Sequence, residues 1–100
     1  MSKLYIAEFR EQANASYGQL LQLPQVPPAA GQVVTFTTST QSAALSAGTT
    51  FVRVVADADC HIEVGGNPTA TTSSVIKLTA GAPEYFGVTA GHKVAVIAAA

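Results

Sequence analysis

Short runs rich in Val, Ile, Thr, Tyr and Phe recur along most of this 100-residue chain, separated by Gly, Pro, Asp, Asn and Ser. β-Branched and aromatic side chains suit a pleated, half-buried surface, whereas the separating residues favour turns. The runs expected to be strands are Lys3–Arg10, Val33–Thr38, Thr50–Ala56, Cys60–Val64, Ser74–Leu78, Glu84–Val88 and Lys93–Ala98. Short strands about ten residues apart predict an all-β fold, a small antiparallel β-sandwich or jelly-roll-like barrel.

Alternation within these runs predicts which side chains face the core. The expected inward residues are Val34, Phe36, Phe51, Val55, Ile62, Val64, Val75, Phe86, Val88, Val94 and Val96. One turn pattern recurs at 45–48, 78–81 and 88–91: an apolar residue, two small residues and a glycine. Glycine supplies the conformational freedom that a tight turn needs, so each copy predicts a change of direction.

A second feature is the absence of any charged residue or histidine from Gln12 to Val52. Ordinary proteins are about 25% charged, whereas this chain is 11% charged overall. Between residues 12 and 31, Gly18 and Pro24 oppose a helix, and further prolines force extended backbone. We therefore expect one domain, in which residues 1–31 form an N-terminal strand and an extended Pro-containing arm or long loop, and residues 32–100 form the β-sandwich.

The arm is the part of the charge-free stretch that a Thr-rich sheet does not explain. An extended apolar segment can lie across a neighbouring subunit or add a strand to its sheet. The residues expected to contact a partner are Leu20, Leu21, Leu23, Pro24, Val26, Pro27 and Pro28. Alternatively, the segment folds back and completes the chain's own sheet.

Composition excludes several classes of protein. The net charge is −1 and the five Lys and Arg residues are scattered singly, so nucleic acid is not an expected partner. A single cysteine allows no intrachain disulfide. The chain has neither the long apolar core of a signal peptide nor the roughly 18 apolar residues of a membrane span, which predicts synthesis in the host cytoplasm and no membrane partner.

The densest polar cluster lies between residues 57 and 63. In a continuous strand, Asp57, Asp59, His61 and Glu63 would project from one face, where carboxylates and an imidazole can bind a cation. We favour the alternative that the two aspartates form a turn and that His61 and Glu63 line the solvated face of the next strand, because the intervening residues form a clean core face.

No other cluster suggests catalysis. Cys60 and His61 are neighbours in sequence, so on a strand they point to opposite faces and cannot pair as nucleophile and base. The segment Gly65-Gly66-Asn67-Pro68 lacks the lysine and helix that follow a phosphate-binding loop. We therefore expect a protein that is not an enzyme and needs no cofactor.

Several segments carry a resemblance to a known group of proteins. They are Lys3–Glu8, Phe51–Val54, Asp59–Ile62, Gly65–Thr71, Glu84–Val88 and Gly91–Ile97. With these strand-and-turn signatures the chain resembles small structural proteins of tailed bacteriophages, and among them head decoration (cement) proteins. The resemblance implies a virion component on the capsid surface that binds the major capsid protein or another virion protein, and that forms a homo-oligomer, commonly a trimer. It assigns no individual functional residue.

Two other functions remain open at this point. One is a different virion role, at the head-tail junction, in the tail or in a fibre. The other is a glycan- or peptide-binding module on the same β-sandwich. Glycan modules usually present an exposed aromatic platform, whereas this chain has no Trp and its tyrosines, Tyr5, Tyr17 and Tyr85, are dispersed in sequence.

Overall fold

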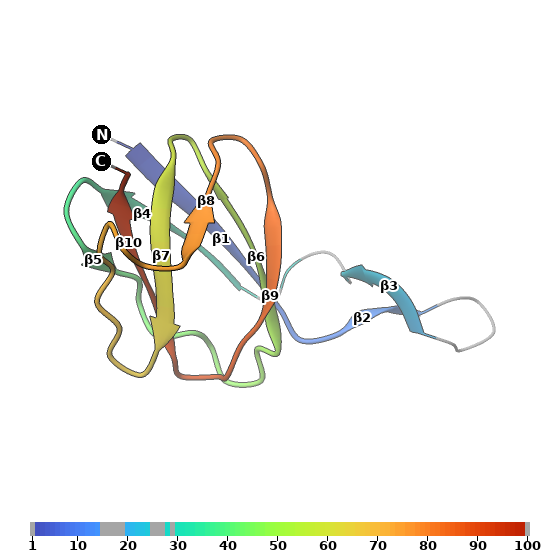
Figure 1. Cartoon of the computed structure of the whole chain (residues 1–100). Helices are drawn as coiled ribbons and strands as arrows, with labels where there is room; N and C mark the ends of the chain where they lie inside the picture. Colours follow the sequence, from blue (N-terminus) through green and yellow to red (C-terminus); the bar gives the residue numbers. More distant parts are fainter. Residues whose placement is uncertain (1, 15–19, 25–27, 29, 100) are drawn as a thin grey trace.

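The computed structural model describes residues 2–14, 20–24, 28 and 30–99 (Figure 1). Within these residues the chain is all-β and has no helix, as predicted. No helix among the described residues is therefore long and apolar enough to cross a membrane. The strands are β1 (Ser2–Phe9), β2 (Gln12–Asn14), β3 (Leu20–Pro24), β4 (Ala30–Phe36), β5 (Thr40–Gln41), β6 (Phe51–Ala56), β7 (Cys60–Gly65), β8 (Ile76–Leu78), β9 (Glu84–Gly87) and β10 (Lys93–Ala98).

Eight of the strands form two antiparallel sheets, which we call the two-sheet body. The first sheet has the order β4-β1-β6-β9, and the second has the order β5-β10-β7-β8. β1 pairs with β4 on one side and with β6 on the other. The N-terminal strand expected from the sequence is therefore present, and its pairing on both sides places residues 2–9 inside the first sheet.

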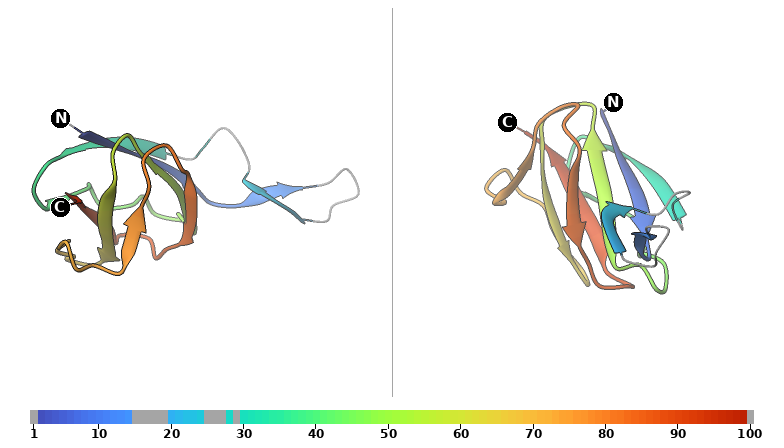
Figure 2. Two further views of the ribbon diagram at one scale, coloured as in Figure 1. Left: turned by 45° about the horizontal axis from the view of Figure 1, so that its top comes forward. Right: turned by 90° about the vertical axis from the view of Figure 1, so that its right-hand side faces the viewer.

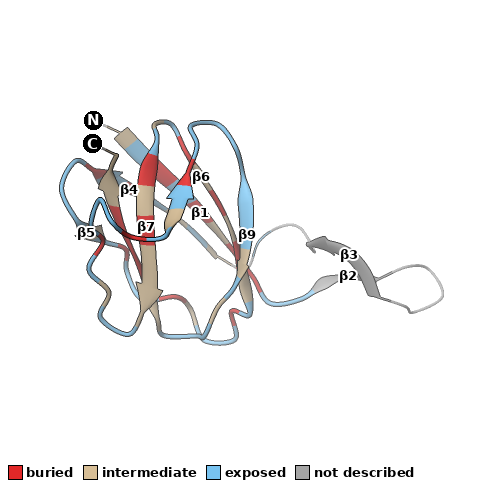
Figure 3. Cartoon of the chain, viewed as in Figure 1, coloured by how far each residue is buried: buried red, intermediate tan, exposed pale blue. Residues whose placement is uncertain are grey.

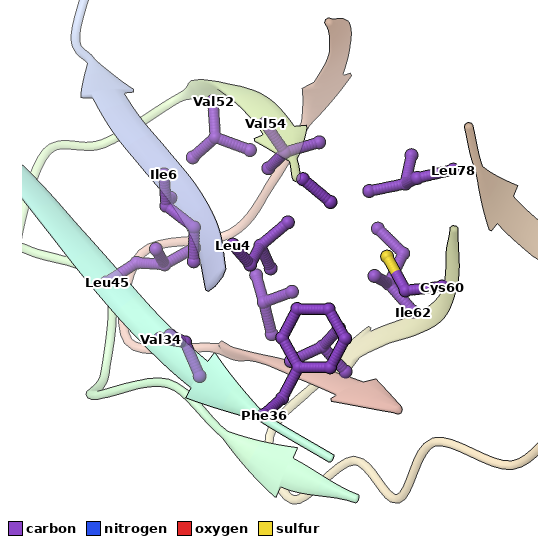
Figure 4. Close-up of a cluster of buried hydrophobic side chains, with 13 residues drawn as sticks. Leu4, Ile6, Val34, Phe36, Leu45, Val52, Val54, Cys60, Ile62 and Leu78 are labelled. Atoms are coloured by element: carbon purple, nitrogen blue, oxygen red, sulfur yellow. The ribbon is translucent and has the colours of Figure 1, made fainter. Parts of the chain in front are cut away.

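The inward faces of both sheets share one hydrophobic core (Figure 4). Leu4, Phe36, Ile62 and Leu78 are at most 1% exposed and come from four different strands. Buried positions lie along the strands of both sheets, whereas the connecting loops are mostly exposed (Figure 3). The core therefore holds the two sheets against each other.

Most of the predicted core residues are inward, but three are not. Val34, Phe36, Ile62, Val94 and Val96 are buried, and Val64, Phe86 and Val88 pack against the core. On β6, Val52, Val54 and Ala56 are buried instead of Phe51 and Val55, and Val75 is 93% exposed, just before β8. β6 is apolar on both faces, so alternation alone could not choose its inward side.

The third sheet is a hairpin in which β2 and β3 pair with each other (Figure 1). It lies between β1 and β4 in the chain and extends beyond one end of the two-sheet body (Figure 1 and the left view of Figure 2). The sequence predicted an extended arm or loop here, so the pairing of Gln12–Asn14 with Leu20–Pro24 is a correction. Pro24 misled the prediction because it lies at the last residue of β3, where an edge strand tolerates it.

The three copies of the recurring turn pattern have the expected conformation. Each ends on a glycine in the left-handed region, with φ of 86° at Gly48, 77° at Gly81 and 86° at Gly91. Residues other than glycine rarely adopt this backbone conformation. The prediction of a turn at each motif is therefore confirmed.

A buried carboxylate fixes one of these turns to the first sheet. Glu8 is 3% exposed and its Oε1 accepts hydrogen bonds from the Ser46 amide at 2.7 Å and from the Thr49 hydroxyl at 2.9 Å. The sequence did not predict this arrangement, because Glu8 meets its two donors only in the folded chain. It positions the 46–49 turn beside the end of β1, where the hairpin begins.

Candidate functional site

The most unusual surface of the two-sheet body is the outer face of the first sheet. Leu4 and Ile6 on β1 point into the core, so the intervening Tyr5 points outward. Tyr5 is opposite Val33 on β4 and opposite Val55 on β6. Directly opposite residues project on the same side of a sheet, so these three side chains form an apolar row across three strands.

A second row lies beside the first on the same face. Ala7 is opposite Gly31 and Arg53, and Arg53 is opposite Tyr85 on β9. Tyr5, Val33 and Tyr85 are 44%, 55% and 53% exposed, and they are three of the four large hydrophobic residues that are exposed in the described chain. We call the residues of these two rows the apolar face: Tyr5, Ala7, Gly31, Val33, Arg53, Val55 and Tyr85.

Small side chains hollow the apolar face into a shallow groove. Ala7 and Gly31 lie side by side, with Tyr5 and Val33 next to them, and Arg53 is the single charged residue that lines the groove. A Cβ atom added to Gly31 would lie 3.5 Å from the Ile6 carbonyl oxygen, which is an ordinary van der Waals contact. A Cβ would therefore fit at residue 31, and packing within the chain does not require glycine there.

The outer face of the second sheet carries four ionisable side chains. His61 and Glu63 project outward from β7, and Lys77 is opposite His61 on β8. Lys93 begins β10, on the other side of β7. Ala95, opposite Glu63, and Ile97, opposite His61, also lie on this face, so its charged side chains flank an apolar strip on β10.

The four residues weighed above as a cation cluster do not come together, as the favoured alternative expects. One carboxylate oxygen of Asp57 accepts the Lys3 amide at 2.8 Å, and one of Asp59 accepts the Ala80 amide at the same distance. His61 Nδ1 lies 2.9 Å from the Ser74 carbonyl oxygen. In the described part of the chain, no group of three or more His, Cys, Asp or Glu is placed to hold a metal ion. The aspartates therefore attach the β6–β7 turn to the start of β1 and to the turn at Ala80, and His61 and Glu63 lie on the outer face of β7.

Cys60 is equally unsuited to chemistry. Its side chain is completely buried in the shared core. Burial, and then the negative charges of Asp59 and Asp57, raise the pKa of its thiol to about 11. The thiol is therefore protonated and inaccessible at neutral pH.

The residues predicted to contact a partner fall in and beside the hairpin. Leu20, Leu21, Leu23 and Pro24 form β3, and Pro28 is exposed. Val26 and Pro27 lie outside the described residues. The sequence analysis missed the apolar face because it assigned Val55 to the core. The sequence did contain a signal for this face. Tyr5 comes two residues after the charged Lys3, so both side chains project on the same, outward side of β1.

Comparison with known protein families, with curated proteins and with solved structures finds no match for this chain.

Proposed function

We propose that this protein is a structural protein of a bacteriophage virion, and that it decorates the capsid as a cement protein. The apolar face is the observation that carries the proposal. A decoration protein acts by burying surface across subunit boundaries, and interface cores are depleted of charge. Of the seven residues of the apolar face, only Arg53 is charged.

The architecture that we propose for the two-sheet body is a β-sandwich, since the two sheets share one core. The proposed assembly is a homo-oligomer, with a trimer favoured, that binds the major capsid protein or another virion protein at the capsid surface. A standard interface takes about 800 Å² from each partner, and its core is depleted of charge. Many copies on one lattice then multiply the strength of modest single contacts.

Binding to capsids tests the function directly. Purified protein is mixed with expanded capsids of a phage that carries this gene, prepared without the protein, and bound copies are counted after sedimentation. We expect hundreds of copies per particle and a higher temperature of capsid disruption. A saturation at about a dozen copies would instead indicate the head-tail junction, the tail or a fibre. No binding, with no change in heat stability, would contradict the virion role at the capsid.

A second candidate is a glycan- or peptide-binding module. The two described tyrosines that are dispersed in sequence lie on one face of the first sheet: Tyr5 in the first row of the apolar face and Tyr85 in the second. Exposed aromatic rings on one face can stack on a ligand. Titration of oligosaccharides while tyrosine fluorescence is recorded tests this function, and a flat response from wild-type protein would exclude stacking on either ring.

A further inference from the structure

Each sheet of the two-sheet body has two edges, and one of the four differs from the others. β4 is an edge of the first sheet, seven residues long, and its sequence AGQVVTF contains no charge and no proline. The opposite edge, β9, has four residues, follows Pro83 and begins with Glu84. On the second sheet, β8 has three residues with Lys77 at the centre, and β5 has two.

Short length, charge and proline are the features that prevent an edge strand from pairing with another chain. Three of the four edges carry at least one of them, and β4 carries none. Val33, at the middle of β4, is also 55% exposed on the apolar face. Among the described residues no strand pairs with the outer side of β4, and the Gln32 side chain of β4 bonds the Ala43 amide and carbonyl in the loop that follows. The β4 edge therefore offers backbone donors and acceptors next to apolar side chains.

The hairpin has the complementary property. β2 and β3 pair with each other and with no strand of the two-sheet body. A two-stranded hairpin alone in water is marginally stable, and a third strand or a covering surface is what stabilises it. β3 contains three leucines in five residues, and the sequence from Gln12 to Pro24 has no charge.

From these two observations we propose that the β2–β3 hairpin of one copy adds to the β4 edge of a second copy. The first sheet of each copy is then extended by strands of its neighbour, through main-chain hydrogen bonds. This inference rests on the proposed function in one respect, since both require contacts between copies. It names one contact between copies, which acts beside the one that the apolar face supplies.

The arrangement of the chain favours a second copy over the chain's own edge. The hairpin leaves the body at the end where β1 stops and β4 starts, and it extends away from the β4 edge (Figures 1 and 2). Donor and acceptor are different surfaces, so the contact is head-to-tail. Such contacts close into a ring when the rotation between copies permits it, and a ring of three copies leaves no hairpin and no β4 edge unpaired.

Cross-linking between two variants tests the pairing. One variant carries Val33→Cys and the other carries Gln22→Cys in β3, and the full-length proteins are mixed and treated with a short bis-maleimide. Native Cys60 is buried and provides the background for both. We expect a covalent dimer in the mixture and little in either variant alone. A dimer formed by Val33→Cys alone would show β4 pairing with β4 and would overturn the proposal. So would an internal cross-link, without dimer, in a chain that carries both cysteines.

A charge at the edge provides an independent test. Val33→Lys is compared with Val75→Lys, which places the same charge at a residue that is 93% exposed and far from β4 in sequence. We expect the edge variant to raise the dissociation constant of the oligomer more than about tenfold and the control to leave it unchanged. Circular dichroism checks that both variants fold, and Thr35→Lys replaces Val33→Lys if the latter does not. Equal dissociation constants for folded edge and control variants would overturn the proposal.

The two proposals fail in different experiments. If the mixture is not cross-linked but the protein decorates capsids, only the hairpin-to-edge contact is wrong. If the mixture is cross-linked but capsids are not bound, the contact between copies stands and the capsid function is wrong.

Discussion

The outer faces of the two sheets differ although the sheets share one core. On the second sheet, β7 alternates strictly: Cys60 and Ile62 are buried, and His61 and Glu63 face outward. On the first sheet, β6 carries valine on both sides, with Val54 in the core and Val55 on the apolar face. Strict alternation is typical of a sheet that water covers on one side, and its loss is typical of a sheet covered on both. β10 of the second sheet departs from alternation too, since Ala95 is buried on the side of Glu63. The contrast between the two outer faces therefore lies in their exposed side chains, which are tyrosine and valine on the first sheet and charged groups on the second.

The largest expected effects on stability come from substitutions in the core that the two sheets share. Leu4→Ala on β1 and Ile62→Ala on β7 each remove a side chain that is at most 1% exposed. We expect each to lower the free energy of unfolding by about 2–5 kcal/mol, measured by urea denaturation. If one substitution were nearly neutral, the two sheets would not share one core, and the comparison of their outer faces would lose its basis.

A smaller effect on stability is expected from the ionisable side chain that each sheet buries. Glu8→Ala leaves the half-buried Ser46 amide and the buried Thr49 hydroxyl without their acceptor, which we expect to cost about 1–3 kcal/mol of unfolding free energy. Glu8→Gln keeps an oxygen at that position and is the matched control, with a smaller loss. Equal losses for both variants would show that the charge, and not the hydrogen bonds, holds the 46–49 turn.

On the second sheet the corresponding group is Cys60, whose effect depends on pH. Because its pKa is raised to about 11 from 9.0, the folded protein keeps a proton that the unfolded chain releases. The stability linked to this proton is complete below pH 9 and is lost as the pH rises toward 11. We therefore expect the stability of wild-type protein to fall relative to Cys60→Ala over this range, measured by thermal unfolding. A constant difference would contradict the burial of the thiol.

Much of the fold could be predicted from the sequence where alternation and turn residues agree. The strands Cys60–Gly65 and Lys93–Ala98 match the prediction within one residue, since each is bounded by turn residues. Thr40–Gln41 was missed because its pairing with β10 joins residues more than fifty positions apart. The hairpin was missed because Gly18 and the prolines conceal two short strands.

The candidate site was harder to predict than the fold. Tyr5, Val33 and Val55 lie far apart in sequence and become neighbours only through the register of β1 with β4 and β6. The charge-free stretch predicts partner contacts for the arm alone, and it remains a prediction. The apolar face also includes Tyr5, Arg53, Val55 and Tyr85, which lie outside that stretch.

A charge placed on the apolar face is expected to change stability least and association between copies most. Tyr5→Glu introduces a charge on the apolar face, and Val75→Glu introduces the same charge at the exposed residue before β8. Both side chains are exposed, so we expect unfolding free energies within about 0.5 kcal/mol of wild type. A larger loss for Tyr5→Glu would show that Tyr5 supports the folded chain itself.

Light scattering coupled to size-exclusion chromatography on the same three proteins tests the central claim that the apolar face is an interface. The account predicts that wild type and Val75→Glu elute with the mass of an oligomer, and that Tyr5→Glu elutes with the mass of one chain. Monomeric wild-type protein at every concentration, or an oligomer that Tyr5→Glu leaves intact, would contradict it.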